Sequence, residues 1–312
     1  MPNATTFHAS KHLGESELGA VQTHCLFCDV DDRVAVTRLQ ADPDVDLMKC
    51  RSCGVCTASR IPTVAALEMY YTGYYERSGN DGPGDSQVTF KHVNRFAGHL
   101  AGVIQGALSP SSLNILDFGG GDGTIVLRMA EQLVAAGYPE VVVTVVEYHD
   151  AVVESTREAI TMRHEPSLDA LASAAGTFDI VIASAIIEHL PDAKTETERL
   201  LAFLRPGGIL YVRTPFVVPV LRLMKRFGLT LDFTFPGHIH DMGQGFWEGY
   251  FSTISPSGPH RIVHSQPSIV ETAFSEHFFR SLVAHCIKLP WRLLGRRYSL
   301  VGGWDIFIQK NP

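Results

Sequence analysis

Apolar residues in the middle of the chain gather into short runs that stop at a polar residue. A largely apolar run over residues 113–116 ends on Asp117, as expected for a parallel strand buried on both faces. A second run, the β-branched residues 141–146, ends on Glu147. Between them residues 125–133 are apolar at helical spacing, as are residues 88–108, and residues 304–309 alternate like a strand. The pattern predicts strands and helices in alternation, and therefore an α/β fold.

Glycine dominates the turn after the first of these strands. Residues 117–124 read Asp-Phe-Gly-Gly-Gly-Asp-Gly-Thr, and glycine lets a backbone approach a ligand closely just before a helix N-terminus. A dinucleotide fingerprint would need a third glycine where Thr124 stands, and a P-loop would need Gly-Lys-Ser/Thr. Neither motif is present. A tight turn with a purely structural purpose is the alternative to a ligand site.

The remaining pattern, Asp-x-Gly-x-Gly-x-Gly, resembles the S-adenosylmethionine loop of class I methyltransferases. The bound cofactor has no phosphate but carries an ammonium and a sulfonium, which suits an acidic residue at the strand end. The resemblance implies that Glu147 accepts hydrogen bonds from the ribose hydroxyls and that Tyr148 packs on the adenine. The full set of cofactor-binding residues implied is Asp117, Gly119, Gly121, Asp122, Gly123, Glu147, Tyr148 and Ser184.

Two further segments follow in the order that this family requires. Residues 178–184 are similar to its fourth strand, and residues 204–212, with a Pro-Gly-Gly turn, lead into its fifth. The resemblance therefore implies a Rossmann-like sheet of seven strands, the last (residues 304–309) antiparallel, in a methyltransferase domain over residues 111–312. We also expect a lid insertion after the fifth strand at about residues 216–260, a helix over 268–278 and a strand over 281–286. Glu165 and Asp169 are both candidates for the adenine contact.

Two Cys-x-x-Cys pairs stand near the N-terminus, Cys25 with Cys28 and Cys50 with Cys53. Separated by a short β-rich stretch, they match a zinc ribbon, in which four thiolates close a tetrahedron around one Zn²⁺. Such a site has no open coordination position, so the metal would be structural. Disulfides, a redox pair and an iron–sulfur cluster are the alternatives, and Cys56 offers a fifth sulfur that could replace a ligand.

Many small-molecule and sugar methyltransferases of bacteria begin with a ribbon that this one resembles, followed by a helix rich in aromatic residues. The expected division is a flexible tail over 1–20, a zinc ribbon over 21–62 and a helical linker or cap over 63–110. Four tyrosines within residues 70–75 could line a substrate pocket or join the ribbon to the catalytic domain.

Histidines supply the candidate catalytic groups. His238 and His240 stand beside Asp241 in a loop after the fifth strand, and His189 follows the fourth strand in Glu-His-Leu. A histidine in the loop could act as general base on an acceptor hydroxyl, join a metal site of two histidines and one carboxylate, or fix the loop by hydrogen bonds. His189 could likewise be a base or a packing residue. We expect the loop to lie over the mouth of the pocket.

Charge and hydropathy narrow the class of partner. A net charge of −7 disfavours a broad nucleic-acid surface, no run has the length of a membrane span, and the N-terminus lacks a secretory signal. These features predict a cytoplasmic enzyme that transfers a methyl group from S-adenosylmethionine to a small-molecule acceptor, such as a sugar or secondary metabolite. An RNA methyltransferase with the ribbon as reader and a non-catalytic binding module are the alternatives. The acceptor, the methylated atom and the oligomeric state stay open.

Overall fold

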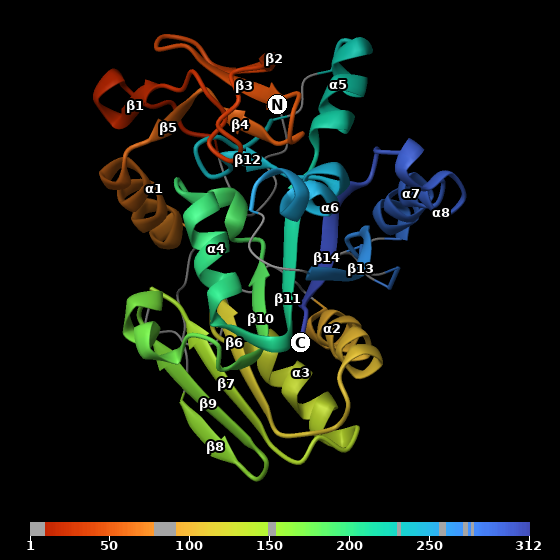
Figure 1. The fold of residues 1–312 in the computed structure, drawn as a ribbon. Coiled ribbons are helices and arrows are strands. Elements are labelled where there is room, and N and C mark those ends of the chain that lie inside the picture. The colour runs from red at the N-terminus through yellow and green to blue at the C-terminus, as the bar shows by residue number, and fades with distance from the viewer. Residues whose placement is uncertain are drawn as a thin grey trace.

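The chain folds into a small N-terminal β-subdomain that sits on one edge of a larger α/β domain (Figure 1). The computed structural model describes residues 10–77, 92–148, 154–229, 232–255, 260–270, 274–275 and 278–312. In this part of the chain no helix is both long and apolar enough to cross a membrane.

The α/β domain is built on one eight-stranded sheet with the order β13-β14-β11-β10-β6-β7-β9-β8. Neighbouring strands β11, β10, β6, β7 and β9 are parallel, and β14 is antiparallel to both β11 and β13. The bounds are β6 Leu113–Phe118, β7 Val141–Val146, β8 Ser155–Arg157, β9 Ile160–Glu165, β10 Phe178–Ser184, β11 Leu204–Phe216, β13 His260–Pro267 and β14 Gly302–Lys310. The α/β prediction and the antiparallel last strand are thereby confirmed.

Three details of the sheet differ from expectation. It has eight strands rather than seven, because the short strand β8 forms a hairpin with β9 at the outer edge. Residues 281–286, predicted as a strand, lie in the helix α7 Phe278–Lys288, and the strand that pairs with the outer side of β14 is β13. A short apolar run fits strand and helix equally well. The sequence also predicts a helix over residues 268–278, but the described residues of this range before Phe278 are not helical.

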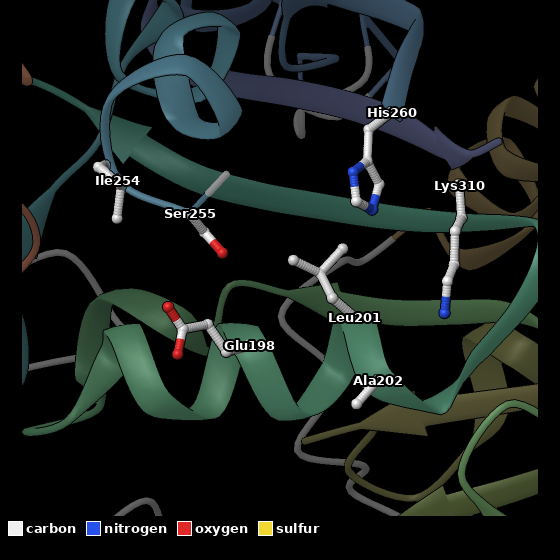
Figure 2. A pocket seen from close by; sticks show the side chains of 7 residues that line it. All are labelled: Glu198, Leu201, Ala202, Ile254, Ser255, His260 and Lys310. Atoms are coloured by element: carbon white, nitrogen blue, oxygen red, sulfur yellow. The ribbon is translucent and has the colours of Figure 1, made fainter. Parts of the chain in front are cut away.

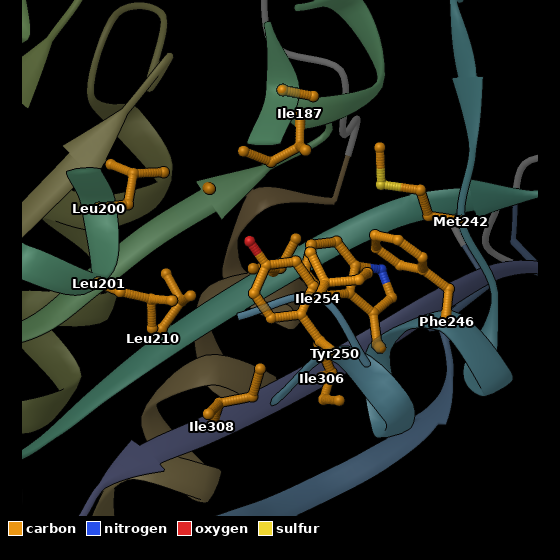
Figure 3. Packing of buried hydrophobic residues seen from close by; sticks show 14 of the residues in the cluster. Ile187, Leu200, Leu201, Leu210, Met242, Phe246, Tyr250, Ile254, Ile306 and Ile308 are labelled. Atoms are coloured by element: carbon orange, nitrogen blue, oxygen red, sulfur yellow. The ribbon is translucent and has the colours of Figure 1, made fainter. Parts of the chain in front are cut away.

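Helices cover both faces of the sheet. On one face α2 Val93–Ala107 and α3 Thr124–Ala135 bury their apolar stripes against β6 and β7. On the other, α4 Ala193–Phe203 and α6 Gln244–Thr253 pack against β10, β11 and β14 (Figure 3). The other helices are α1 Val64–Arg77, α5 Val218–Arg226, α8 Trp291–Leu294 and the 3₁₀ turns η1 Glu15–Glu17, η2 Leu168–Ala174, η3 Ile187–His189 and η4 Gly295–Arg297.

The N-terminal subdomain contains a four-stranded antiparallel sheet with the order β12-β4-β3-β2. Strands β2 Arg33–Gln40, β3 Val45–Cys50 and β4 Cys56–Ala58 come from the ribbon, whereas β12 His240–Asp241 comes from the segment after β11. A separate pair joins β1 Leu18–Val21 to β5 Arg60–Pro62. Order extends into the predicted tail of residues 1–20, since Leu13 is fully buried and residues 15–21 form η1 and β1. Residues 1–9 lie outside the described part.

The two parts of the molecule share one core. The ring of Phe27 in the ribbon lies 5.0 Å from that of Phe246 in α6 and 5.4 Å from that of His240. Ribbon cysteines belong to the same buried cluster as Trp247 and Tyr250. The insertion after the fifth strand therefore docks the ribbon onto the carboxyl edge of the sheet.

Candidate cofactor and metal sites

The glycine turn has a backbone geometry that favours glycine. Gly119, Gly121 and Gly123 have φ values of +70°, +58° and +75°, a region that side chains disfavour. A Cβ at Gly120 would lie 2.4 Å from Oδ2 of Asp117, and one at Gly119 would lie 2.8 Å from Cγ1 of Ile186. The turn thus packs tightly on the end of β6 and on the residues after β10.

Two carboxylates flank this turn. Asp117, at the carboxyl end of β6, is only 5% exposed, and burial together with the charge of Glu147 raises its pKa to about 7. Glu147 follows β7, and its Oε2 accepts a hydrogen bond from the amide of Gly121 at 3.0 Å. The carboxyl edge of the sheet therefore offers acceptors for a cation and for hydroxyl groups.

The other residues predicted to bind the cofactor lie around the same edge, at different depths. Asp122 accepts a hydrogen bond from the amide of Thr124 at 2.9 Å and so stabilises the start of α3. Tyr148 is 80% exposed. Ser184 ends β10, and within the described residues its buried Oγ has no hydrogen-bond partner.

The structure separates the two candidates for the adenine contact. Glu165 ends β9 beside Glu147, whose amide donates to the Glu165 carbonyl at 3.2 Å. Asp169 lies in η2 and forms an ion pair with Arg199 of α4 at 2.6 Å. Glu165 is therefore the better placed of the two at the carboxyl edge.

The four predicted zinc ligands come together in the ribbon. The Sγ atoms of Cys25, Cys28, Cys50 and Cys53 lie within 4.8 Å of one another, and the pairs Cys25–Cys53 and Cys28–Cys50 are each 3.6 Å apart. A tetrahedral Zn²⁺ with Zn–S bonds of about 2.3 Å places its sulfurs about 3.8 Å apart. The four thiols thus fit a closed metal site without rearrangement.

Cys56, the possible substitute ligand, is not part of this group. It lies on β4 opposite Asp241 of β12, and burial raises the pKa of its thiol. Its position is that of a small apolar residue in the subdomain core.

A second group of potential ligands lies between η3 and the residues before β12. Ligand atoms of Glu188, His189 and His238 are within 4.8 Å of one another, and the two imidazole rings stack with centroids 4.9 Å apart. Burial raises the pKa of Glu188 to about 8 and lowers that of His189 to about 4. The sequence analysis names His189 as a candidate catalytic residue but gives no role to its neighbour Glu188, because a carboxylate in such a segment is usually exposed to solvent.

His240 and Asp241 have different surroundings from His238. The imidazole of His240 is fully buried, with Nδ1 3.1 Å from the Thr57 hydroxyl and Nε2 2.9 Å from the Leu190 carbonyl; burial lowers its pKa to about 4. Asp241 accepts hydrogen bonds from the amides of Val217 and Val218 at the start of α5. These groups hold the ribbon, η3 and α5 together, and two residues of the expected lid, His240 and Asp241, pair with β4 of the ribbon as strand β12.

Residues of the glycine turn line neither of two cavities in the described part of the chain. One of about 530 Å³ lies between α4 and the start of β13, with Glu198, His260 and Lys310 at its wall (Figure 2). Lys310 donates to the carbonyl of Leu204, which begins β11, so this cavity is at the amino end of that strand. Ligands of open α/β sheets bind at the carboxyl ends, and we do not assign the cofactor to it. The second, of about 310 Å³, lies beside α2 and α7.

Comparison with known proteins agrees with this architecture. A family model described as a methyltransferase domain matches residues 90–251. A ubiquinone biosynthesis O-methyltransferase of Mesorhizobium japonicum is 29% identical over 122 residues, which is 38% of this chain and 45% of the relative. A trans-aconitate 2-methyltransferase of Azoarcus sp. is 31% identical over 114 residues, 36% of this chain and 43% of the relative. The chain thus spans less than half the length of these two relatives.

Among solved structures, the 1,6-didemethyltoxoflavin-N1-methyltransferase of Burkholderia thailandensis aligns over its whole length with 88% of this chain. The two share 15% sequence identity, and the TM-score is 0.45. The family model spans more than half of the 312 residues, and its match contains the glycine turn, β7, β10 and β11. The chain belongs to the methyltransferase-domain family.

Proposed function

We propose that the protein transfers a methyl group from S-adenosylmethionine to a small-molecule acceptor. The observation that carries the proposal is the buried Asp117 beside Glu147, on either side of a turn whose glycines leave the backbone open to a ligand. A phosphate-bearing cofactor would be repelled by two carboxylates, whereas one with an ammonium and two ribose hydroxyls complements them. Both relatives described above are named as methyltransferases of small molecules.

Each residue at this edge has a role in holding the cofactor. Asp117 attracts the ammonium, Glu147 exchanges its bond with the Gly121 amide for the ribose hydroxyls, and Tyr148 and Glu165 flank the adenine. When bound, S-adenosylmethionine supplies an electrophilic methyl group on a sulfonium. The protein contributes alignment of the acceptor with that methyl group and a place for the proton that the acceptor loses.

Of the three candidate histidines, His189 and His238 fit a role beside the acceptor better than His240. His189 ends η3, which follows β10, and the His238 ring stacks on it; Ile186, just before η3, lies against Gly119. Both ring nitrogens of His240 are already within hydrogen-bond distance of Thr57 and Leu190. We assign His240 to the joint between the subdomains. In the ribbon, the four thiols are proposed to hold one structural Zn²⁺.

Calorimetric titration with S-adenosylmethionine tests the proposal. Charge-assisted hydrogen bonds contribute roughly 1.5–3 kcal/mol, so Glu147→Ala should weaken binding by about one to two decades. Glu140→Ala is the matched control, because Glu140 is an exposed acid just before the same strand, at its opposite end, and should leave affinity unchanged. Equal affinity of Glu147→Ala and the wild type, or tighter binding of NAD than of S-adenosylmethionine, would refute the proposed site.

A further inference from the structure

The chain between β13 and β14 turns many apolar side chains toward solvent. Phe279 of α7 is 80% exposed, and Leu293 of α8 is 87% exposed. The other large apolar residues that are exposed in this region are Phe274, Phe278, Leu282, Val283, Ile287, Leu289 and Leu294. Single exposed apolar residues are common on proteins, whereas a group of this size usually marks a contact surface. We call these nine residues the α7–α8 surface.

Helix α7 is amphipathic, but its apolar side faces outward. Phe279, Leu282 and Val283 follow the spacing of three and four residues that places side chains on one face of a helix, and all three are exposed. Ser281, on the opposite side, is fully buried, and Lys288 on that side donates to the backbone just after β13. The helix therefore attaches to the domain through its polar side, and folding alone leaves its apolar side uncovered.

The two helices are held together as one unit. The hydroxyl of Tyr298, just after η4, donates to the carbonyl of Ile287 in α7 at 2.6 Å. The ring of Trp291 in α8 packs on that of Trp304 in β14, with centroids 5.6 Å apart. Figure 1 shows α7 and α8 next to each other at the outside of the α/β domain. The exposed residues of both helices therefore belong to one fixed surface.

Positive charge is concentrated in the same segment. Residues 277–304 contain five Lys or Arg and no Asp or Glu, in a chain whose net charge is −7. Arg292, Arg296 and Arg297 are exposed. Arg296 forms an ion pair with Glu248 of α6, whereas no acidic side chain of the described chain lies within ion-pair distance of Arg292 or Arg297. The α7–α8 surface therefore combines apolar side chains with basic residues that can attract an anionic partner.

We propose that the α7–α8 surface docks on a membrane that carries anionic lipids. The aromatic and aliphatic side chains enter the boundary between headgroups and acyl chains, and the arginines contact the lipid phosphates. Binding of this kind lies in the plane of the interface and needs no spanning helix. Charge favours lipid over a second copy of the chain, because a symmetric pairing of two such surfaces would bring their basic residues together.

The test is flotation of the full-length protein with vesicles made of phosphatidylglycerol and phosphatidylcholine in equal parts, compared with vesicles of phosphatidylcholine alone. We expect binding to the mixed vesicles, and added salt should weaken it because it screens the charges. Phe279→Ser combined with Leu293→Ser removes two apolar contacts, and Arg292→Glu combined with Arg297→Glu reverses two charges. Each pair of substitutions should weaken binding at least about tenfold.

Matched controls change exposed residues of the same kinds in other elements. Val64→Ser combined with Met69→Ser removes two exposed apolar side chains from α1. Arg128→Glu combined with Arg157→Glu, in α3 and β8, changes the net charge by the same amount as the arginine variant of the α7–α8 surface. Both controls should bind the mixed vesicles as the wild type does. Circular dichroism checks that each variant is folded.

A wild-type protein that fails to float with the mixed vesicles, or that binds equally to neutral vesicles, would overturn the inference whether or not the variants fold. So would full binding by both variants of the α7–α8 surface. Sedimentation without lipid tests the alternative occupant. A dimer that dissociates in Phe279→Ser combined with Leu293→Ser, without vesicle binding by the wild type, would assign the surface to a second copy of the chain.

Discussion

Among single residues, Asp117 is the clearest case in which the proposed function conflicts with stability. Its carboxyl group is 5% exposed and faces the charge of Glu147, which disfavours ionisation in the absence of a cationic ligand. A core residue selected for stability alone would be neutral at this position. The neighbouring Gly120, whose Cβ would touch Asp117, shows that the turn is shaped around the carboxylate.

We predict that Asp117→Asn stabilises the ligand-free protein at alkaline pH. The pKa of Asp117 is about 7, against an ordinary value of 3.8, so between these values the folded chain binds the proton that the unfolded chain has lost. The contribution of Asp117 to the free energy of unfolding is therefore fully present below about pH 4. It falls as the pH rises from about 4 to 7 and is lost above pH 7. Removing the charge should raise the free energy of unfolding above pH 7 by on the order of 4 kcal/mol and leave it nearly unchanged below pH 4.

Urea unfolding of the ligand-free wild type and variant measures this difference, at about pH 4.5, about pH 6 and about pH 8, which span the window in which the two states differ in bound protons. Asp122→Asn is the control, because Asp122 stands in the same turn and an asparagine there can still accept from the Thr124 amide. A difference between Asp117→Asn and wild type that does not grow with pH would contradict the prediction.

At the scale of elements, the sequence predicted those whose signals are local. Short sequence patterns predict the turn after Asp117, strands β6 and β7, and the cluster of four cysteine thiols. The structure contains all of them. Strand β12 was missed because its two residues form a strand only by pairing with Thr57 and Cys56, far away in the chain. Glu188 was missed for the same reason, since only folding brings His238 beside it.

Within the ribbon, we predict that Cys53 is a metal ligand and Cys56 is not. Cys53→Ala leaves three thiolates and an incomplete tetrahedron, so the thiolate-to-cobalt absorption should fall well below half of the wild-type value. Cys56→Ala is the matched change three residues along, and it should keep the full band because Cys56 lies on β4 outside the cluster. Cobalt titration followed by absorption spectroscopy distinguishes them. Loss of the band in Cys56→Ala, together with its retention in Cys53→Ala, would show that Cys56 rather than Cys53 is the fourth ligand.

For the whole molecule, the ribbon and the α/β domain behave as one structural unit. Strand β12 leaves the α/β domain to complete the ribbon sheet, and Phe27 of the ribbon packs between Phe246 and His240. Residues of both parts form a single buried cluster that includes Trp247 and Trp304. Loss of the ribbon would therefore expose apolar surface on the α/β domain as well.

We predict that removing the metal proposed for the ribbon destabilises both parts together. Freeing Phe27 from its site should cost as much as truncating a buried aromatic residue, about 3–5 kcal/mol, which lowers the melting temperature of a domain this size by about 10 °C. Because Trp247 and Trp304 are buried in the shared core, their fluorescence should change in the same transition as the circular dichroism, before and after chelation. Phe27→Ala, which keeps all four cysteines, should lower the melting temperature of the metal-loaded protein by a similar amount. An early transition of the ribbon that leaves the tryptophan signal unchanged would show instead that the two parts unfold independently.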